Sequence, residues 1–218
     1  MATVGRKPEG QGALKTNVVK TSNASIKDIM NAIRSMHKVS IPQTKEFAKD
    51  FDFTRERGFR DLWSRVKQYT YKADSMEHQI VKSARALDQI GVGDCKSFSI
   101  VGATTMINGG VEEVYYDLVH YGKENQAHIY PVGYLDGEEV VVDSVHDFFN
   151  ERAYGEAYYE RYDARTLKKV ASGTIRGVDR LDKFIKVGSI AGGAYLMTRK
   201  SNVQKAVGFV MILFGIFK

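Results

Sequence analysis

The feature that most constrains the fold is a tight turn at residues 135–138, with the sequence Leu-Asp-Gly-Glu, between two apolar-rich segments. Asp-Gly is a strong signal for a two-residue β-hairpin turn. Folding about this turn pairs residues whose numbers sum to 273, so Tyr130 faces Asp143. Because side chains alternate along a strand, His128 shares a face with Tyr130 and lies diagonal to Asp143, roughly 7 Å away at the backbone. The sequence therefore predicts that an imidazole and a carboxylate meet on this hairpin.

Pro131 lies within the first arm of this hairpin. Proline cannot donate a ladder hydrogen bond, so its presence favours an edge strand or a bulge. A one-residue bulge would reverse the faces of the side chains that follow and separate His128 from Asp143. The pairing therefore depends on a regular register.

Cys95 is the only cysteine of the chain, and it follows Gly93 and Asp94 at the start of a largely apolar segment. Asp94 is a favoured N-cap, so Cys95 would be the first residue of a helix. Unpaired backbone N–H groups and the helix dipole favour an anion there and could donate to an oxyanion. Taken alone, Cys95 could equally be a small buried apolar residue. Asp94 acts against a thiolate unless its charge is used in capping.

A thiol, an imidazole and a carboxylate in this order are the groups that a cysteine nucleophile needs. We predict that Cys95 is the nucleophile, that His128 is the general base and then acid, and that Asp143 orients His128. A shifted register would make His120 or His146 the base instead. His37 and His78 have no acid or cysteine motif beside them, so we expect both on the surface.

Three segments, 71–74, 82–85 and 93–99, resemble the core of the transglutaminase-like cysteine peptidase superfamily. The likeness spans roughly residues 54–144 and is greatest to bacteriophage and bacterial versions, and His128 and Asp143 match the remaining triad positions. The resemblance implies an α+β, papain-like fold, with the nucleophile helix packed on a small antiparallel sheet. It also implies thiol-based amide or peptide hydrolysis, or transamidation. Gln68 and Tyr71 are candidate side-chain donors to the oxyanion.

Other classes of site lack a sequence signal. No pair of histidines has metal-ligand spacing with further cysteine or carboxylate partners, so we expect no metal. Isolated glycine pairs do not make a phosphate-binding loop, and we expect no cofactor. Residues 1–11 are polar and do not resemble a signal peptide. One cysteine and no such signal suggest the cytoplasm or a phage virion.

We expect three parts: a flexible basic arm (1–23), a catalytic domain (24–164), and a basic, apolar attachment segment (165–218). Residues 165–218 carry eleven Lys or Arg and two Asp, a net charge of +9, whereas the whole chain carries +6. Basic ends favour an anionic partner such as nucleic acid, a phospholipid surface or an acidic protein.

The C-terminal apolar runs, 187–197 and 206–217, are shorter than the ~18–20 residues that span a bilayer. They could form a membrane-inserted hairpin, a docking or homo-oligomerisation element, or a buried helix. An exposed apolar patch of this size needs a partner, which favours docking. A non-enzymatic virion or assembly protein is therefore the alternative to a hydrolase.

Helical patterns fill much of the rest of the chain. Ser25 and Asp28 form a capping-box pattern before a helix, and a second helix is predicted over about 54–69, with Trp63 in the core. Tyr154, Tyr158 and Tyr162 lie four residues apart and favour a third helix over 147–163.

Overall fold

The computed structural model describes residues 18–75, 77–121, 127–152 and 158–174. All of these lie in the first of two units, Met1–Thr174 and Ile175–Lys218. The expected arm up to residue 17, and both C-terminal apolar runs, lie outside the described residues.

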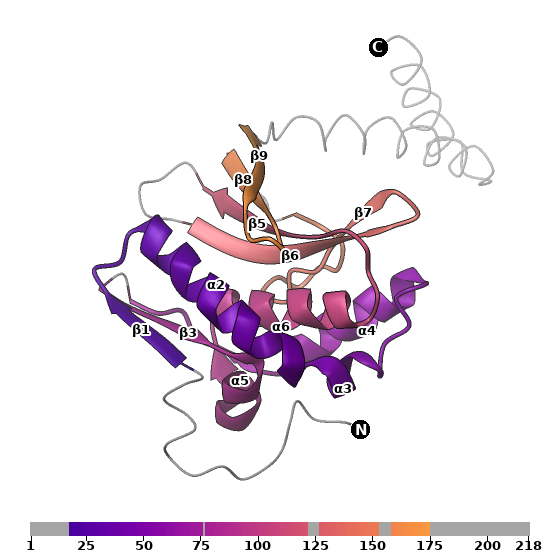
Figure 1. Ribbon diagram of the computed structural model, residues 1–218, viewed down its shortest axis with the longest axis horizontal. Coiled ribbons are helices and arrows are strands. Elements are labelled where there is room, and N and C mark those ends of the chain that lie inside the picture. Colours follow the sequence, from indigo (N-terminus) through magenta and orange to yellow (C-terminus); the bar gives the residue numbers. More distant parts are fainter. Residues whose placement is uncertain (1–17, 76, 122–126, 153–157, 175–218) are drawn as a thin grey trace, which may run out of the picture. The chain divides into compact units, whose positions relative to one another are not determined.

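The first unit is an α+β structure in which an antiparallel sheet covers one side of a central helix, α6 (Cys95–Asn108) (Figure 1). The sheet has the order β7-β6-β5-β8-β9 in the described part of the chain. Its strands are β5 (Val114–His120), β6 (Ala127–Leu135), β7 (Glu138–Val141), β8 (Tyr158–Asp163) and β9 (Lys169–Thr174). This agrees with the expected nucleophile helix on an antiparallel sheet.

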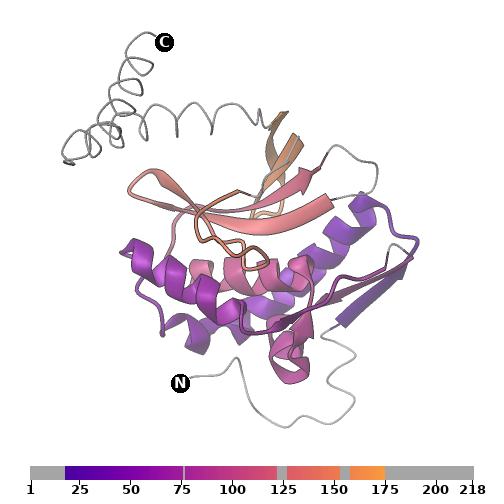
Figure 2. The same cartoon turned by 180° about the vertical axis from the view of Figure 1, so that it is seen from behind.

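Further helices surround α6 on the sides that the sheet leaves open. They are α2 (Ile26–Gln43), α3 (Lys45–Ala48), α4 (Glu56–Val66) and α5 (Ala84–Ile90). Helix α2 lies on one side of α6 and α4 on the other, as the front and back views show (Figures 1 and 2). The predicted capping box of Ser25 and Asp28 starts α2, and α4 falls within the second predicted helix.

Helix α6 is enclosed on all sides. Every residue from Lys96 to Met106 is buried, and a helix that is apolar around its whole circumference belongs in a core. On the sheet side, a Cβ added at Gly102 would lie 2.7 Å from Cγ of Pro131 on β6. The absence of a side chain at Gly102 therefore allows α6 and β6 to pack closely.

The hairpin of β6 and β7 has the predicted register. Val132 pairs with Val141 and Leu135 with Glu138, and the turn residues Asp136 and Gly137 have φ values of 52° and 80°. Positive φ at both central positions is the geometry that Asp-Gly favours.

Pro131 lies in an internal strand, so the expectation of an edge strand or a bulge is wrong. β6 pairs with β5 and β7 without a register shift. Pro131 comes just beyond the last β6–β7 pair, and its carbonyl accepts a hydrogen bond of 3.0 Å from Val142 N. The N–H that proline lacks would point toward β7, and β7 ends just before this position. Proline is therefore tolerated there.

The body extends beyond both expected boundaries. β1 (Val18–Ser22), within the expected arm, pairs with β3 (His78–Lys82). At the other end, β9 pairs with β8, and Leu167 is buried. Residues 158–163 form a strand and not the expected helix, because β5 and β9 supply its hydrogen-bonding partners and tyrosine is favoured in strands.

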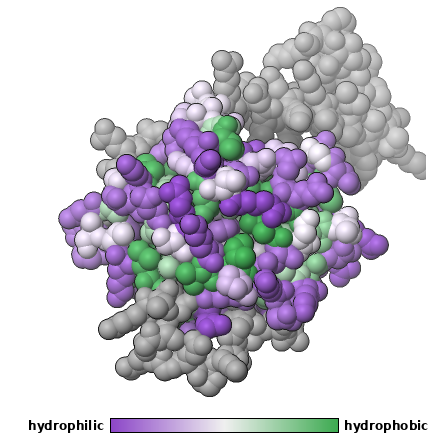
Figure 3. Space-filling view, viewed as in Figure 1, coloured by the Kyte–Doolittle hydropathy of each residue, from purple (hydrophilic) through white to green (hydrophobic). Residues whose placement is uncertain are grey.

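Polar and apolar side chains are interspersed on the described surface in Figure 3. Within the described residues, no helix has the length and apolar character needed to cross a membrane.

The buried C-terminal residues of the body yield a prediction. A chain ending at Ala164 lacks β9 and Leu167, whose carbonyl accepts a hydrogen bond of 2.8 Å from Arg34 Nη2. We expect its free energy of unfolding to be lower than that of a chain ending at Thr174 by at least ~2–5 kcal/mol, the usual effect of removing one buried leucine side chain. Urea denaturation of the two chains measures the difference, and equal midpoints would contradict the assignment of β9 to the body.

Candidate active site

Cys95 is the first residue of α6, as the sequence predicts, and its side chain is partly exposed. Asp94 is the N-cap, and its Oδ1 accepts a hydrogen bond of 3.3 Å from Ser97 N. The other oxygen, Oδ2, is hydrogen-bonded to Lys96 Nζ. The charge of Asp94 is thus used in capping and in an ion pair, which weakens its repulsion of a thiolate on Cys95.

Lys96 is a buried ammonium group beside the thiol. Its side chain is only 7% exposed, and its Nζ pairs with Asp94 and lies 3.3 Å from Asp74 Oδ2. Burial opposes the charge on Lys96, but Asp94, Cys95 and Asp74 together raise its pKa above the ordinary value. Asp74 also accepts a hydrogen bond of 2.6 Å from Ile80 N, so the cluster joins the start of α6 to β3. A buried lysine has no local signature in a sequence, so this cluster was not predicted.

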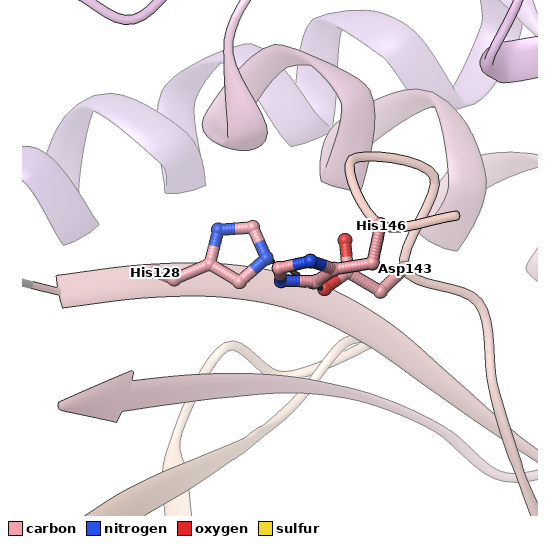
Figure 4. Close-up of side chains that lie close together, drawn as sticks. All are labelled: His128, Asp143 and His146. Carbon is pink, nitrogen blue, oxygen red and sulfur yellow. Dashed lines mark hydrogen bonds and ion pairs between the residues drawn. The ribbon is translucent and has the colours of Figure 1, made fainter. Parts of the chain in front are cut away.

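His128 and Asp143 meet as the hairpin register predicts. His128 Nε2 lies 2.7 Å from Asp143 Oδ2, and both side chains are buried (Figure 4). Asp143 Oδ1 accepts a hydrogen bond of 3.1 Å from Val145 N. Trp63 Nε1 donates to the carbonyl oxygen of Asp143 at 2.8 Å. These bonds fix the carboxylate although it lies two residues beyond the end of β7.

His128 is hydrogen-bonded to Cys95 as well as to Asp143. Nε2 of His128 is hydrogen-bonded to Asp143, so Nδ1 is the ring nitrogen that is available to the sulfur of Cys95. Burial acts to lower the pKa of His128, but the hydrogen bonds and charges of Asp143 and Cys95 outweigh it and raise the pKa to about 10. An imidazole with this pKa is protonated at neutral pH. A positively charged imidazolium next to a sulfur atom stabilises negative charge on that sulfur.

The two candidate oxyanion side chains lie in different places. β2 (Thr70–Tyr71) pairs in parallel with β4 (Val92–Gly93), directly before α6. Burial, and then the charges of Cys95, Asp94 and others, raise the pKa of Tyr71 to about 12, so its phenol remains a hydrogen-bond donor. Gln68 is exposed and lines a separate cavity with Asp50, Phe51, Asp61, Ser64 and Arg65. The structure therefore brings Tyr71 to the site and does not bring Gln68.

Two histidines were alternatives to His128. His120 on β5 lies beside Tyr158, with ring centroids 5.9 Å apart, and has no contact with Cys95 among those the structure describes. His146 packs edge-on against His128 at 5.2 Å, and its Nε2 lies 3.4 Å from Asp143 Oδ2. His128 is therefore the histidine that interacts with both Cys95 and Asp143, and His146 adjoins Asp143.

The remaining histidines divide between core and surface. His78 is exposed, as expected. The expectation for His37 is wrong: it is buried, and its Nδ1 lies 2.7 Å from Tyr116 Oη. Burial lowers the pKa of His37 to about 4, so it is a neutral core residue. The hydrogen bond to Tyr116 on β5 gives this ring nitrogen of His37 a partner and so allows the side chain to be buried.

A small cavity of about 70 Å³ adjoins the thiol and the imidazole. Its walls are mostly aliphatic and come from α2, α6, β3, β5 and β6. The lining residues are Ile26, Ile29, Met30, Ile33, Gln79, Cys95, Lys96, Leu118, Ala127, His128 and Ile129. An apolar recess beside a nucleophile can receive an aliphatic group of a bound molecule.

The buried ammonium of Lys96 yields a second prediction. Lys96→Met leaves Asp94 and Asp74 without their cation, and breaking a buried ion pair in this way typically destabilises a protein by ~3–5 kcal/mol. Lys27→Met, on the exposed face of α2, is the matched control and should change the free energy of unfolding by less than ~0.5 kcal/mol. Urea denaturation measures both. A Lys96→Met protein as stable as the control would show that the pair is not needed for folding.

No protein-family model matches this chain, and no curated protein matches it. Among solved structures, the chain is similar to calcium-bound LapG of Legionella pneumophila, with 18% identity and a TM-score of 0.44 over 73% of this chain and 98% of that one. The EGTA-treated form of LapG gives 17% identity and a TM-score of 0.42, covering 71% and 91% of the two chains. A protein of Cytophaga hutchinsonii, whose description proposes a cysteine protease, gives 14% identity and a TM-score of 0.38, covering 61% and 42%. The function proposed below therefore rests on the side chains of the site.

Proposed function

We propose that this protein is a thiol-dependent amide or peptide hydrolase with Cys95 as its nucleophile. The observation that carries the proposal is the position of His128, hydrogen-bonded to Cys95 on one side and to Asp143 on the other. A nucleophile, a base and a group that orients the base are the minimum for covalent catalysis of this kind.

In the proposed mechanism, the sulfur of Cys95 attacks the carbonyl carbon of the scissile amide. The oxyanion that forms accepts hydrogen bonds from the backbone N–H of Cys95 at the start of α6 and from the phenol of Tyr71. The protonated Nδ1 of His128 gives its proton to the departing amine, which leaves a thioester on Cys95. His128 then accepts a proton from water, the resulting hydroxide attacks the thioester, and the acid product and the thiol are released.

The surroundings of the thiol favour a peptide substrate with an aliphatic side chain near the scissile bond. The cavity beside Cys95 is lined by side chains of Ile29, Met30 and Ile33 and by Leu118 and Ile129. Its small volume suits a short aliphatic group better than an aromatic ring. Cleavage of a peptide library, with Cys95→Ala as the inactive control, tests both the activity and this preference.

A transamidase is the second candidate within the same chemistry, because a primary amine can replace water as the acceptor of the thioester. An attachment role is compatible with either activity and rests on the net charge of +9 and the two apolar runs within residues 165–218. Binding of these residues to a protein assembly, a second copy of the chain, a membrane surface or nucleic acid stays a prediction. So does an association with phage or with the cytoplasm.

The proposed pairing of a Cys95 thiolate with the His128 imidazolium gives a direct test of the nucleophile. We expect iodoacetamide to alkylate Cys95 rapidly even near pH 6, where an ordinary thiol with a pKa of about 8.5 is almost fully protonated. His128→Ala should slow alkylation at this pH on the order of 100-fold and restore the steep rise with pH of a free thiol. Intact-mass spectrometry follows the reaction, and His78→Ala is the matched control. Identical pH profiles for the native protein and His128→Ala would refute the proposed nucleophile.

Asp143 can be tested separately from the thiol. Asp143→Asn keeps the shape of the side chain but no longer stabilises the correct imidazole tautomer, so we expect kcat on a cleaved peptide to fall by as much as ~10⁴-fold. KM should change little, since Asp143 does not contact the substrate. Asp147→Asn removes a nearby exposed carboxylate, which pairs with Lys67, and serves as the control. If the Asp143→Asn and Asp147→Asn proteins had the same kcat, Asp143 would not be the acid that orients His128.

A further inference from the structure

Three potential metal ligands converge at the inner end of the site (Figure 4). One atom each from His128, Asp143 and His146 lies within 4.8 Å of the others. Histidine spacing in the sequence gave no sign of this group, because His128 belongs to β6 while Asp143 and His146 lie in the loop after β7. The hairpin and this loop bring the three together.

His146 is the unexplained member of the group. The proposed mechanism uses His128 and Asp143 and leaves His146 without a role. Its Nε2 atom is buried and has no hydrogen-bond partner among the described residues. This atom lies 3.4 Å from Asp143 Oδ2. Lys67 Nζ donates to the carbonyl of His146 at 2.8 Å and helps to hold the loop in place.

We propose that His128, Asp143 and His146 form a Zn²⁺ site that competes with the catalytic arrangement. Two imidazoles and one carboxylate, with a fourth position for water, are a common ligand set for zinc. The side chain of His146 is 36% exposed although its Nε2 atom is buried, so solvent reaches the ring but not the ligand atom itself. Binding of the ion is independent of the proposed hydrolase function, whereas its inhibitory effect rests on that function.

The two separations between Asp143 and the histidine nitrogens are compatible with the ion, one of them after a small adjustment. Zinc–nitrogen and zinc–oxygen distances of about 2.0–2.2 Å place neighbouring ligand atoms of a tetrahedral site about 3.4 Å apart. The separation of 3.4 Å between His146 Nε2 and Asp143 Oδ2 already has this value. The 2.7 Å between His128 Nε2 and Asp143 Oδ2 must widen by about 0.7 Å, within the reach of side-chain rotation.

Coordination would change the protonation state of His128. The ion takes the place of the proton on Nε2, and that proton passes to the buffer. The imidazole keeps its proton on Nδ1, the nitrogen that faces Cys95, but giving up this proton would leave an imidazolate, so the ring becomes a weaker acid than the imidazolium of the metal-free site. Asp143 is bound to the ion at the same time and no longer orients the imidazole. A zinc-bound protein would therefore be unable to deliver the proton that the proposed mechanism gives to the departing amine.

The test uses the full-length Cys95→Ser protein, because a thiol near an imidazole binds zinc by itself. Isothermal titration with ZnCl₂ in a non-chelating buffer should give one site. Adding His146→Ala should weaken this binding by about tenfold or more, since even partners outside the ligand set contribute 10–100-fold to metal affinity. Adding His78→Ala, which removes an exposed histidine on β3, should leave the affinity unchanged.

A second measurement does not depend on the His146 variant being folded. Long-range ¹H–¹⁵N spectra of the Cys95→Ser protein should show the proton of His128 on Nδ1 when zinc is added, and the resonances of His146 should shift with it. The proposal is overturned if Cys95→Ser binds no zinc, which would make the sulfur a required ligand. It is also overturned if His146→Ala binds zinc as tightly as its parent, or if the imidazole resonances of His128 and His146 do not respond.

Discussion

The close packing of α6 against β6 is the constraint on which the site depends. The helix carries the thiol at its first residue, and the strand carries the imidazole, so the distance between the elements sets the distance between the two groups. Gly102 lets the ring of Pro131 approach the helix axis. Nearer the site, the hydroxyl of Ser99 lies 2.7 Å from the carbonyl of Cys95 and 2.8 Å from that of Ile129, between helix and strand. The approach of Cys95 to His128 depends on this pair of elements.

The loop that carries Asp143 is held by a different set of forces. Asn150 accepts a hydrogen bond of 2.9 Å from Val141 N through its side chain and so returns the loop to β7. Arg152 reaches Asp117 Oδ2 at 2.9 Å and Glu139 Oε1 at 2.6 Å. Asp117 is completely buried, and Arg161 on β8 supplies the second guanidinium that its carboxylate needs. Charged side chains on β5, β7 and β8 thus stabilise the loop that carries Asp143.

Local sequence signals predicted the parts of the site that depend on short stretches of chain. The Asp-Gly turn determines the register of β6 and β7, and the Asp94 cap places Cys95 at the first residue of α6. Both depend on interactions over a few residues. The ion pair of Lys96 with Asp74, the burial of His37 against Tyr116 and the strand over residues 158–163 were not predicted. Each of them requires a partner far away in the chain, on an element whose position the sequence does not reveal.

The division of the site between a helix and a hairpin also has a consequence for the order of folding. The turn at Asp136 and Gly137 joins β6 to β7 through contacts close in sequence, which form quickly. The contact between Cys95 and His128 spans 33 residues and exists only after the helix has docked on the sheet. Until then, the thiol of a newly made chain is chemically ordinary. In the proposed mechanism, Cys95 would therefore become reactive only once the helix has docked on the sheet, which would protect the unfinished chain and its neighbours from premature attack.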